Sequence, residues 1–111
     1  MEKIFFPDSE IKTDIIELGG VFRKIRAHDS KMMIVEVFFE TGAKAPEHKH
    51  FHEQITYCIE GEFEFCVEGI SYRMKCGDSV YIQPDKLHFV VCHKKGRLLD
   101  VFTPQREDFL S

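Results

Sequence analysis

The sequence has no long hydrophobic run, no basic patch and no paired-cysteine motif, and each absence excludes a class of protein. Its apolar runs are far shorter than the about 20 residues that a membrane-spanning helix needs. The net charge is -4 and the charges are scattered, so the electrostatic footprint of a nucleic-acid-binding protein is missing. Residues 1–7 lack the apolar core of a secretory signal peptide. We expect a cytoplasmic protein that binds neither nucleic acid nor membranes.

The four cysteines also fit a cytoplasmic protein. Cys58, Cys66, Cys76 and Cys92 form no Cys-x-x-Cys pair, which makes a thiolate zinc site or a disulfide framework a poor interpretation. We expect reduced thiols that pack as small apolar side chains.

The residues that are present predict one all-β domain spanning residues 1–111. Hydrophobic residues make up 43% of the chain and charged residues 31%, a globular balance. Short β-branched and aromatic segments alternate with turn residues, as in a sandwich or barrel. The predicted strands are 21–26, 32–39, 54–60, 63–67, 70–74, 79–82, 89–93 and 97–102. A polar loop is expected at 41–47, turns at 61–62, 68–69 and 76–78, an N-terminal edge segment at 1–18, and a helix only at 105–110.

A group of side chains between residues 48 and 54 predicts a metal site. Residues two apart in an extended segment point to the same face, so His48, His50 and Gln54 share one side. Two imidazoles with a third donor beyond them can bind one cation. His88, which opens a strand after a turn, is the best candidate for a distant fourth ligand. Such a donor set suits nickel, zinc, manganese, iron or copper.

Other polar residues near this group have competing interpretations. His52 shares the same parity and could replace one of the four ligands. Glu53 has the opposite parity, so we expect its carboxylate to be solvated or to hydrogen-bond to a metal ligand without binding the metal. His28 and His93 have no matching partners, so we expect them to be structural or exposed.

These spacings resemble the two sequence motifs of the cupin family. Residues 42–61 match the first motif, Gly-x5-His-x-His-x3-Glu-x6-Gly, except that Gln54 replaces the glutamate. Residues 77–88 match the second motif only at Gly77 and His88. The resemblance implies a single-domain cupin jelly-roll barrel with its metal-binding motifs within residues 42–93. The neutral Gln54 amide should leave the metal a stronger Lewis acid and bind it less tightly.

Further segments resemble the KdgF family of small pectin-degradation cupins. The stretches that carry this resemblance are 18–20, 27–29, 32–37, 48–54 and, most specifically, 100–110. The resemblance covers nearly the whole chain. It implies a metal-dependent enzyme that converts 4,5-unsaturated monouronates, released from pectin or alginate, to the linear keto form.

The family's site residues carry over onto this chain. The resemblance implies His48, His50, Gln54 and His88 as metal ligands, Asp100 and Arg106 as catalytic residues, and Phe102 and Arg106 as substrate-binding residues. In the implied mechanism the metal polarises the substrate, Arg106 orients its carboxylate and Asp100 moves a proton.

The residues around Asp100 also allow less specific interpretations. Leu98, Asp100 and Phe102 share one strand face, and an acidic group on an apolar face needs a partner or a function. The structural alternative is an Asp100–Arg106 ion pair that closes the barrel mouth, and for Phe102 it is plain core packing.

Other functions also fit these patterns. Another metal-dependent enzyme, such as a dioxygenase or a sugar isomerase, fits the scaffold, as does a non-catalytic sensor of small molecules.

Both faces of the predicted strands 32–39 and 97–102 are largely apolar, although a small barrel has one interior. A homodimer is the simplest cover for the second face, and the N-terminal segment is the alternative.

Overall fold

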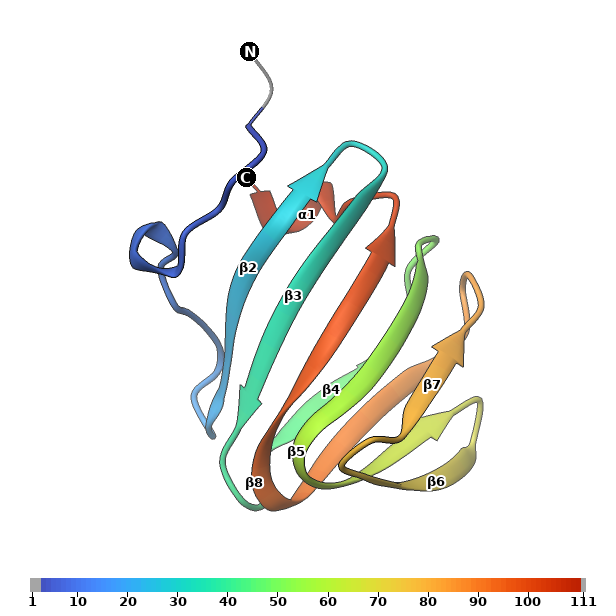
Figure 1. Cartoon of the computed structure of the whole chain (residues 1–111). Coiled ribbons are helices and arrows are strands. Elements are labelled where there is room, and N and C mark those ends of the chain that lie inside the picture. The colour runs from blue at the N-terminus through green and yellow to red at the C-terminus, as the bar shows by residue number, and fades with distance from the viewer. Residues whose placement is uncertain (1–2, 111) are drawn as a thin grey trace.

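The computed structural model describes residues 3–110 and shows an all-β architecture, as predicted (Figure 1). Two short helical segments flank the strands, the 3-10 helix Asp8–Glu10 and α1 at Glu107–Leu110. The strands are β1 (Asp14–Glu17), β2 (Val21–Asp29), β3 (Met32–Phe39), β4 (Lys44–His48), β5 (Glu53–Val67), β6 (Ile70–Lys75), β7 (Ser79–Ile82) and β8 (His88–Thr103).

Two long strands, β5 and β8, connect two layers of antiparallel pairs. In one layer, β8 after Gly96 pairs with β3, which continues to β2 and β1, while the first half of β5 pairs with β7. In the other layer, the first half of β8 pairs with β4 and the second half of β5 pairs with β6. The two layers face one another in Figure 1. Buried side chains from both layers, such as Val35 and Phe65, form one core cluster.

Glycines allow the two long strands to cross where they bend. Gly61 has a φ of 94°, and a Cβ added there would collide with the Lys94 carbonyl oxygen. A Cβ on Gly96 would collide with the carbonyl oxygen of Glu60. The turn predicted at 61–62 is therefore wrong, because β5 bends there through register shifts and continues its pairing with β8.

Two other boundaries also differ from the sequence prediction. Residues 44–47 were expected in a polar loop but belong to the edge strand β4, where Lys44 and Glu47 are exposed and Pro46 is tolerated at an edge. The predicted strands 89–93 and 97–102 are halves of the single strand β8. The turns at 68–69 and 76–78 and a helix within 105–110 are confirmed.

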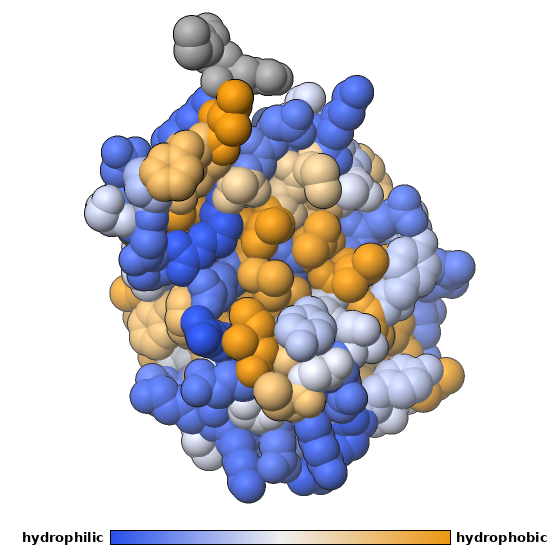
Figure 2. All heavy atoms as spheres, viewed as in Figure 1, coloured by the Kyte–Doolittle hydropathy of each residue, from blue (hydrophilic) through white to orange (hydrophobic). Residues whose placement is uncertain are grey.

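The outer face of the first layer carries exposed apolar side chains. The pairing register places Ile34, Val101, Ile55 and Tyr81 in one row across four strands. Figure 2 shows hydrophobic side chains gathered in the middle of this face. Ile55 is 48% exposed and Tyr81 is 52% exposed. In the described part of the chain, no helix has the length and apolar character needed to cross a membrane.

Candidate metal centre

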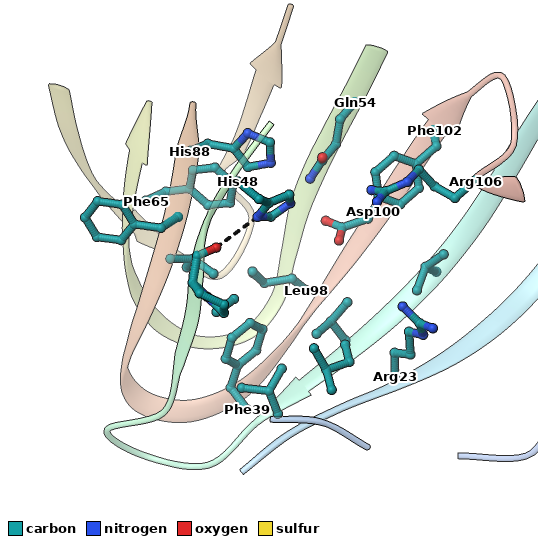
Figure 3. A pocket seen from close by; sticks show the side chains of 18 of the residues that line it. Arg23, Phe39, His48, Gln54, Phe65, His88, Leu98, Asp100, Phe102 and Arg106 are labelled. Carbon is teal, nitrogen blue, oxygen red and sulfur yellow. Dashed lines mark hydrogen bonds between the residues drawn. The ribbon is translucent and has the colours of Figure 1, made fainter. Parts of the chain in front are cut away.

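A pocket of about 330 Å³ lies between the two layers. Most of its wall is apolar and comes from side chains of β3, β5 and β8, including Val35, Val37, Phe65 and Leu98. A few polar side chains project into it, as Figure 3 shows for His48, Gln54, His88, Asp100, Arg23 and Arg106. A mostly apolar pocket with a few converging polar groups is typical of a small-molecule site.

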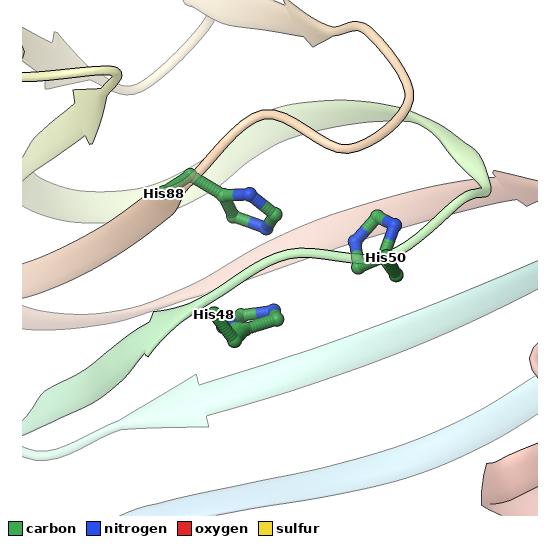
Figure 4. Close-up of side chains that lie close together, drawn as sticks. All are labelled: His48, His50 and His88. Carbon is green, nitrogen blue, oxygen red and sulfur yellow. The ribbon is translucent and has the colours of Figure 1, made fainter.

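Three predicted ligands come together, and two of them, His48 and His88, line one end of the pocket. His48 ends β4, His50 lies in the following loop, and His88 begins β8 directly opposite His48 in the register. One ligand atom from each of the three lies within 4.8 Å of the others, and no other group of this kind occurs among residues 3–110 (Figure 4). These three side chains could hold one metal ion.

Backbone carbonyls orient all three imidazoles. Nδ1 of His48 donates to the Pro46 carbonyl at 2.9 Å (dashed in Figure 3), Nδ1 of His88 donates to the carbonyl of residue 86 at 2.9 Å, and Nδ1 of His50 donates to that of residue 52 at 3.1 Å. A carbonyl oxygen can only accept, so Nδ1 carries the proton and the Nε2 lone pair is left for a cation.

The protonation of the group also suits a metal. Burial lowers the pKa of His88 to about 4 and lowers the pKa of His50. Both rings are therefore neutral at pH 7, the form that binds metals. Nε2 of His88 is buried and has no hydrogen-bond partner among the described residues. A buried nitrogen with an unused lone pair is costly unless a ligand occupies it.

Gln54, the remaining predicted ligand, lies beside His50. Its Oε1 is 2.9 Å from Nε2 of His50, and its Nε2 donates to Oγ1 of Thr56 at 2.9 Å. With His50 neutral and protonated on Nδ1, two acceptors face each other across this short distance. A shared cation would stabilise that arrangement, so the donor set fits a metal ion.

Asp100 lies beyond Gln54 on the same wall. Its inward face is shared with Leu98 and Phe102, as the strand alternation predicted. Burial raises the pKa of Asp100 to about 6, although hydrogen bonds from Thr56 and Gln54 and the charge of Arg106 act in the opposite direction. Oγ1 of Thr56 donates to Oδ1 of Asp100 at 2.6 Å. Such a carboxyl can accept or release a proton near neutral pH.

Arg106 does not form the structural ion pair with Asp100 that was one alternative. Its Nε and Nη2 instead donate to the two carboxylate oxygens of Asp108, at 3.0 and 2.8 Å. The two residues are close in the sequence: Arg106 directly precedes α1, and Asp108 lies in its first turn. Arg106 still lines the pocket, and its guanidinium carbon lies 5.0 Å from the centre of the Phe102 ring.

Phe102 lies in the core and also lines the pocket. It is 2% exposed. Its ring centre lies 5.6 Å from that of His50. The ring therefore packs against the histidine group and forms part of the wall that a substrate would touch.

The competing histidines lie outside the group. His52 is buried beside Phe102, and its two ring nitrogens do not join the three-histidine cluster. Glu53 points to the outer surface and accepts a hydrogen bond from the Tyr81 hydroxyl at 2.5 Å. His93 is exposed and half-buried His28 binds a backbone carbonyl, as expected for structural or solvated residues.

One pocket residue was missed by the sequence analysis. Arg23 lies on β2 and lines the pocket. Its alternation with Val21 and Ile25 could have identified it, because a charged residue on an otherwise apolar strand face is unusual.

Comparisons with known proteins agree with this architecture. A family model described as a cupin domain matches residues 35–102. The pectin degradation protein KdgF of Dickeya dadantii (strain 3937) is 39% identical over 109 residues, covering 96% of this chain and 97% of that protein. The solved structure of KdgF from Halomonas sp. has a TM-score of 0.89 at 34% identity, covering 97% of this chain and 99% of that one. An RmlC-like cupin from Shewanella frigidimarina NCIMB 400 has a TM-score of 0.90 at 34% identity, covering 97% and 96%.

Proposed function

The chain belongs to the cupin family, and within it to the KdgF proteins, and on this premise we propose that it converts 4,5-unsaturated monouronates to their linear keto form with one bound divalent metal ion. One observation carries the proposal: Asp100, a carboxyl with a pKa of about 6, lines the same pocket as His48 and His88, two members of the three-histidine group. The pocket volume of about 330 Å³ suits a single sugar ring rather than a chain.

In this proposal His48, His50 and His88 hold the metal through Nε2, and Gln54 holds it through its amide oxygen. Nickel, zinc, manganese, iron and copper all accept such nitrogen-rich sets. The bound cation would act as a Lewis acid that withdraws electron density from substrate oxygens. The carbonyl partners of the three imidazoles keep the rings in place before the ion binds.

The proposed reaction moves protons without a net change in composition. The substrate is a cyclic enol ether, with its double bond between C4 and C5 and its ring oxygen between C5 and C1. Opening breaks the C1–oxygen bond, so that C1 and C5 become carbonyl carbons. One proton leaves the C1 hydroxyl and one arrives at C4. A group that both accepts and donates protons near pH 7 serves such a reaction.

Asp100 is the residue that we assign to this proton transfer. Its raised pKa allows either protonation state near neutral pH, and the hydrogen bond from Thr56 holds one carboxylate oxygen in place. Leu98 and Phe102 flank it on the same strand face and keep water away from the transfer. Arg106, held by Asp108, contributes a hydrogen bond to the substrate, and Phe102 packs against the sugar.

The direct test follows the ultraviolet absorbance of unsaturated monogalacturonate with purified, metallated protein. Loss of absorbance faster than in buffer, abolished by a chelator and restored by added metal, is the expected result. His88→Ala, which removes the buried ligand, should behave like the chelated protein, whereas His93→Ala on the exposed surface of the same strand should behave like the wild type. A fully metallated wild-type protein that matches the buffer rate would refute the proposal.

A further inference from the structure

Arg23 is a charged side chain on the apolar inner wall of the barrel. It alternates with Val21 and Ile25 on β2 and lies opposite Val37 in the β2–β3 register. It lines the pocket, and its side chain is only 20% exposed. A guanidinium stays charged at any physiological pH and carries five N–H donors, so its burial requires acceptors.

The structure supplies Arg23 with few partners. Its Nε lies 3.5 Å from Oδ2 of Asp14, an ion-pair distance that is too long for a good hydrogen bond. Nε is buried without an acceptor, and no hydrogen bond among residues 3–110 engages the rest of the guanidinium. Its other contact is the ring of Phe109, whose centre lies 3.8 Å from the guanidinium carbon. The donors of Arg23 are therefore unused at the edge of the pocket.

Arg106 contrasts with Arg23. Asp108 already occupies its Nε and Nη2 in a two-bond pairing, and this carboxylate also compensates its charge. Phe109 lies against both arginines, with its ring centre 4.2 Å from the guanidinium carbon of Arg106. Of the two cations around this ring, Arg23 has more hydrogen-bond donors available for an anion, because none of them is engaged at a good hydrogen-bond distance.

We propose that Arg23 is the residue that binds the substrate carboxylate, which makes the pocket specific for sugar acids over neutral sugars. In Figure 3 the histidines His48 and His88 lie at one end of the pocket, Arg23 lies at the other end with Arg106, and Asp100 projects between them. A monouronate held at Arg23 by its carboxylate on C5 would present its enol ether to Asp100 and its hydroxyl-bearing carbons to the histidines. The identity of the substrate rests on the proposed function, whereas the anion preference rests on Arg23.

The test compares Arg23→Gln, Arg23→Lys and the control Arg73→Gln, which changes an exposed arginine on β6. With metallated protein and unsaturated monogalacturonate, Arg23→Gln should raise KM about 10-fold or more with a much smaller change in kcat, as expected for the loss of a hydrogen-bonded charge. Arg23→Lys should recover part of the loss, because it restores the charge but not the planar fork. Arg73→Gln should match the wild type.

A second measurement separates this inference from the proposed function. Calorimetric binding should show that the wild-type protein prefers galacturonate to galactose, and that Arg23→Gln loses this preference. Arg23-dependent galacturonate binding without turnover would support the inference while refuting the proposed function. Turnover with an unchanged KM in Arg23→Gln, or a wild-type protein that does not distinguish galacturonate from galactose, would overturn the inference. A merely structural role would lower thermal stability in Arg23→Gln and leave the ligand preference intact.

Discussion

The polar residues of the pocket are held by neighbours that take no part in the proposed chemistry. Thr56 connects Gln54 to Asp100, because its hydroxyl accepts from the amide and donates to the carboxylate. This connection joins a predicted metal ligand to the proposed acid–base group. Asp100 is not itself a predicted ligand, so a substitution there removes none of them.

We predict that Asp100→Asn lowers kcat about 100-fold or more, because the amide cannot exchange the proton that the reaction moves. Steady-state turnover of unsaturated monouronate measures the effect. The matched control, Glu53→Gln, changes an exposed carboxylate on the adjacent strand and should retain full activity. Wild-type turnover by Asp100→Asn, at equal metal content, would exclude Asp100 as the proton-transfer group.

A second buried carboxylate, that of Glu36 on β3, stabilises the fold. It is 5% exposed and receives hydrogen bonds from Arg26 at 2.6 and 3.0 Å and from Arg97 at 2.7 Å. Burial would raise the pKa of Glu36, but the two arginines outweigh burial and lower it. A carboxyl with a lower pKa in the folded state stabilises the protein above its unfolded pKa, and this contribution is lost as pH falls through the folded value.

We therefore predict that Glu36→Gln lowers the free energy of unfolding by about 1–3 kcal/mol at pH 7, since it weakens bonds to two arginines. The difference from the wild type should shrink as the pH falls below about 4.5, the ordinary range for Glu. Urea unfolding at several pH values measures it. Glu40→Gln, at a 53% exposed side chain, should show little effect at any pH. A deficit that stays constant down to pH 3 would contradict this account.

Among the strands, β5 and β8 determine the geometry of the site because each contributes to both layers. The first half of β8 carries His88, and the second half carries Asp100 and Phe102. The bend near Gly96 brings these halves to opposite walls of one pocket. The strand crossing thus places the predicted metal ligand His88 and the proposed acid–base group Asp100 in one pocket, although they lie far apart along one strand.

We predict that Gly96→Ala destabilises the protein by roughly 2–4 kcal/mol, because the new methyl group would overlap the backbone of Glu60 and Gly61. Urea unfolding followed by circular dichroism provides the measurement. Gly19→Ala is the matched control, because an added Cβ at Gly19 meets no atom within 4 Å. Equal midpoints for the two variants would show that the strands can separate at the crossing without cost.

At the level of the whole molecule, the outer face of the first layer lacks a cover within the described chain. The N-terminal segment, the alternative cover, contacts β2 through Asp8 and Arg26. It leaves Ile55 and Tyr81 exposed. Figure 2 shows the apolar centre of this face between hydrophilic borders, a pattern that is typical of an interface. Dimerisation and a cytoplasmic location stay predictions.

We predict a homodimer that buries this face, with a sedimentation coefficient that corresponds to twice the chain mass. Ile55→Lys should shift the protein to the monomer, because a charge at the centre of an apolar interface is costly. Ile70→Lys, at a 57% exposed position on β6 in the other layer, should remain dimeric. A monomeric wild-type protein at micromolar concentration would exclude the dimer.

Local patterns in the sequence were sufficient for the fold class and for much of the site. Strand alternation predicted that Asp100 points inward with Leu98 and Phe102, because side-chain parity depends only on extended backbone. The same rule was wrong for His48, His50 and Gln54 as members of one extended segment, because His50 lies in the loop between β4 and β5. The assignment of Asp100, Phe102 and Arg106 to a substrate came from the family resemblance. Their catalytic roles stay predictions.

Contacts between distant segments depended on the tertiary structure. His48 and His88 come together only because β4 pairs with β8, and the sequence analysis placed residues 44–47 of β4 in a loop. It also predicted a turn at 61–62 and two separate strands on either side of Gly96, but Gly61 and Gly96 permit a close crossing of two continuous strands. Arg106 binds Asp108 rather than Asp100, and Arg23 lines the same pocket. Pairing register and partner choice are settled by long-range packing, which a local pattern does not contain.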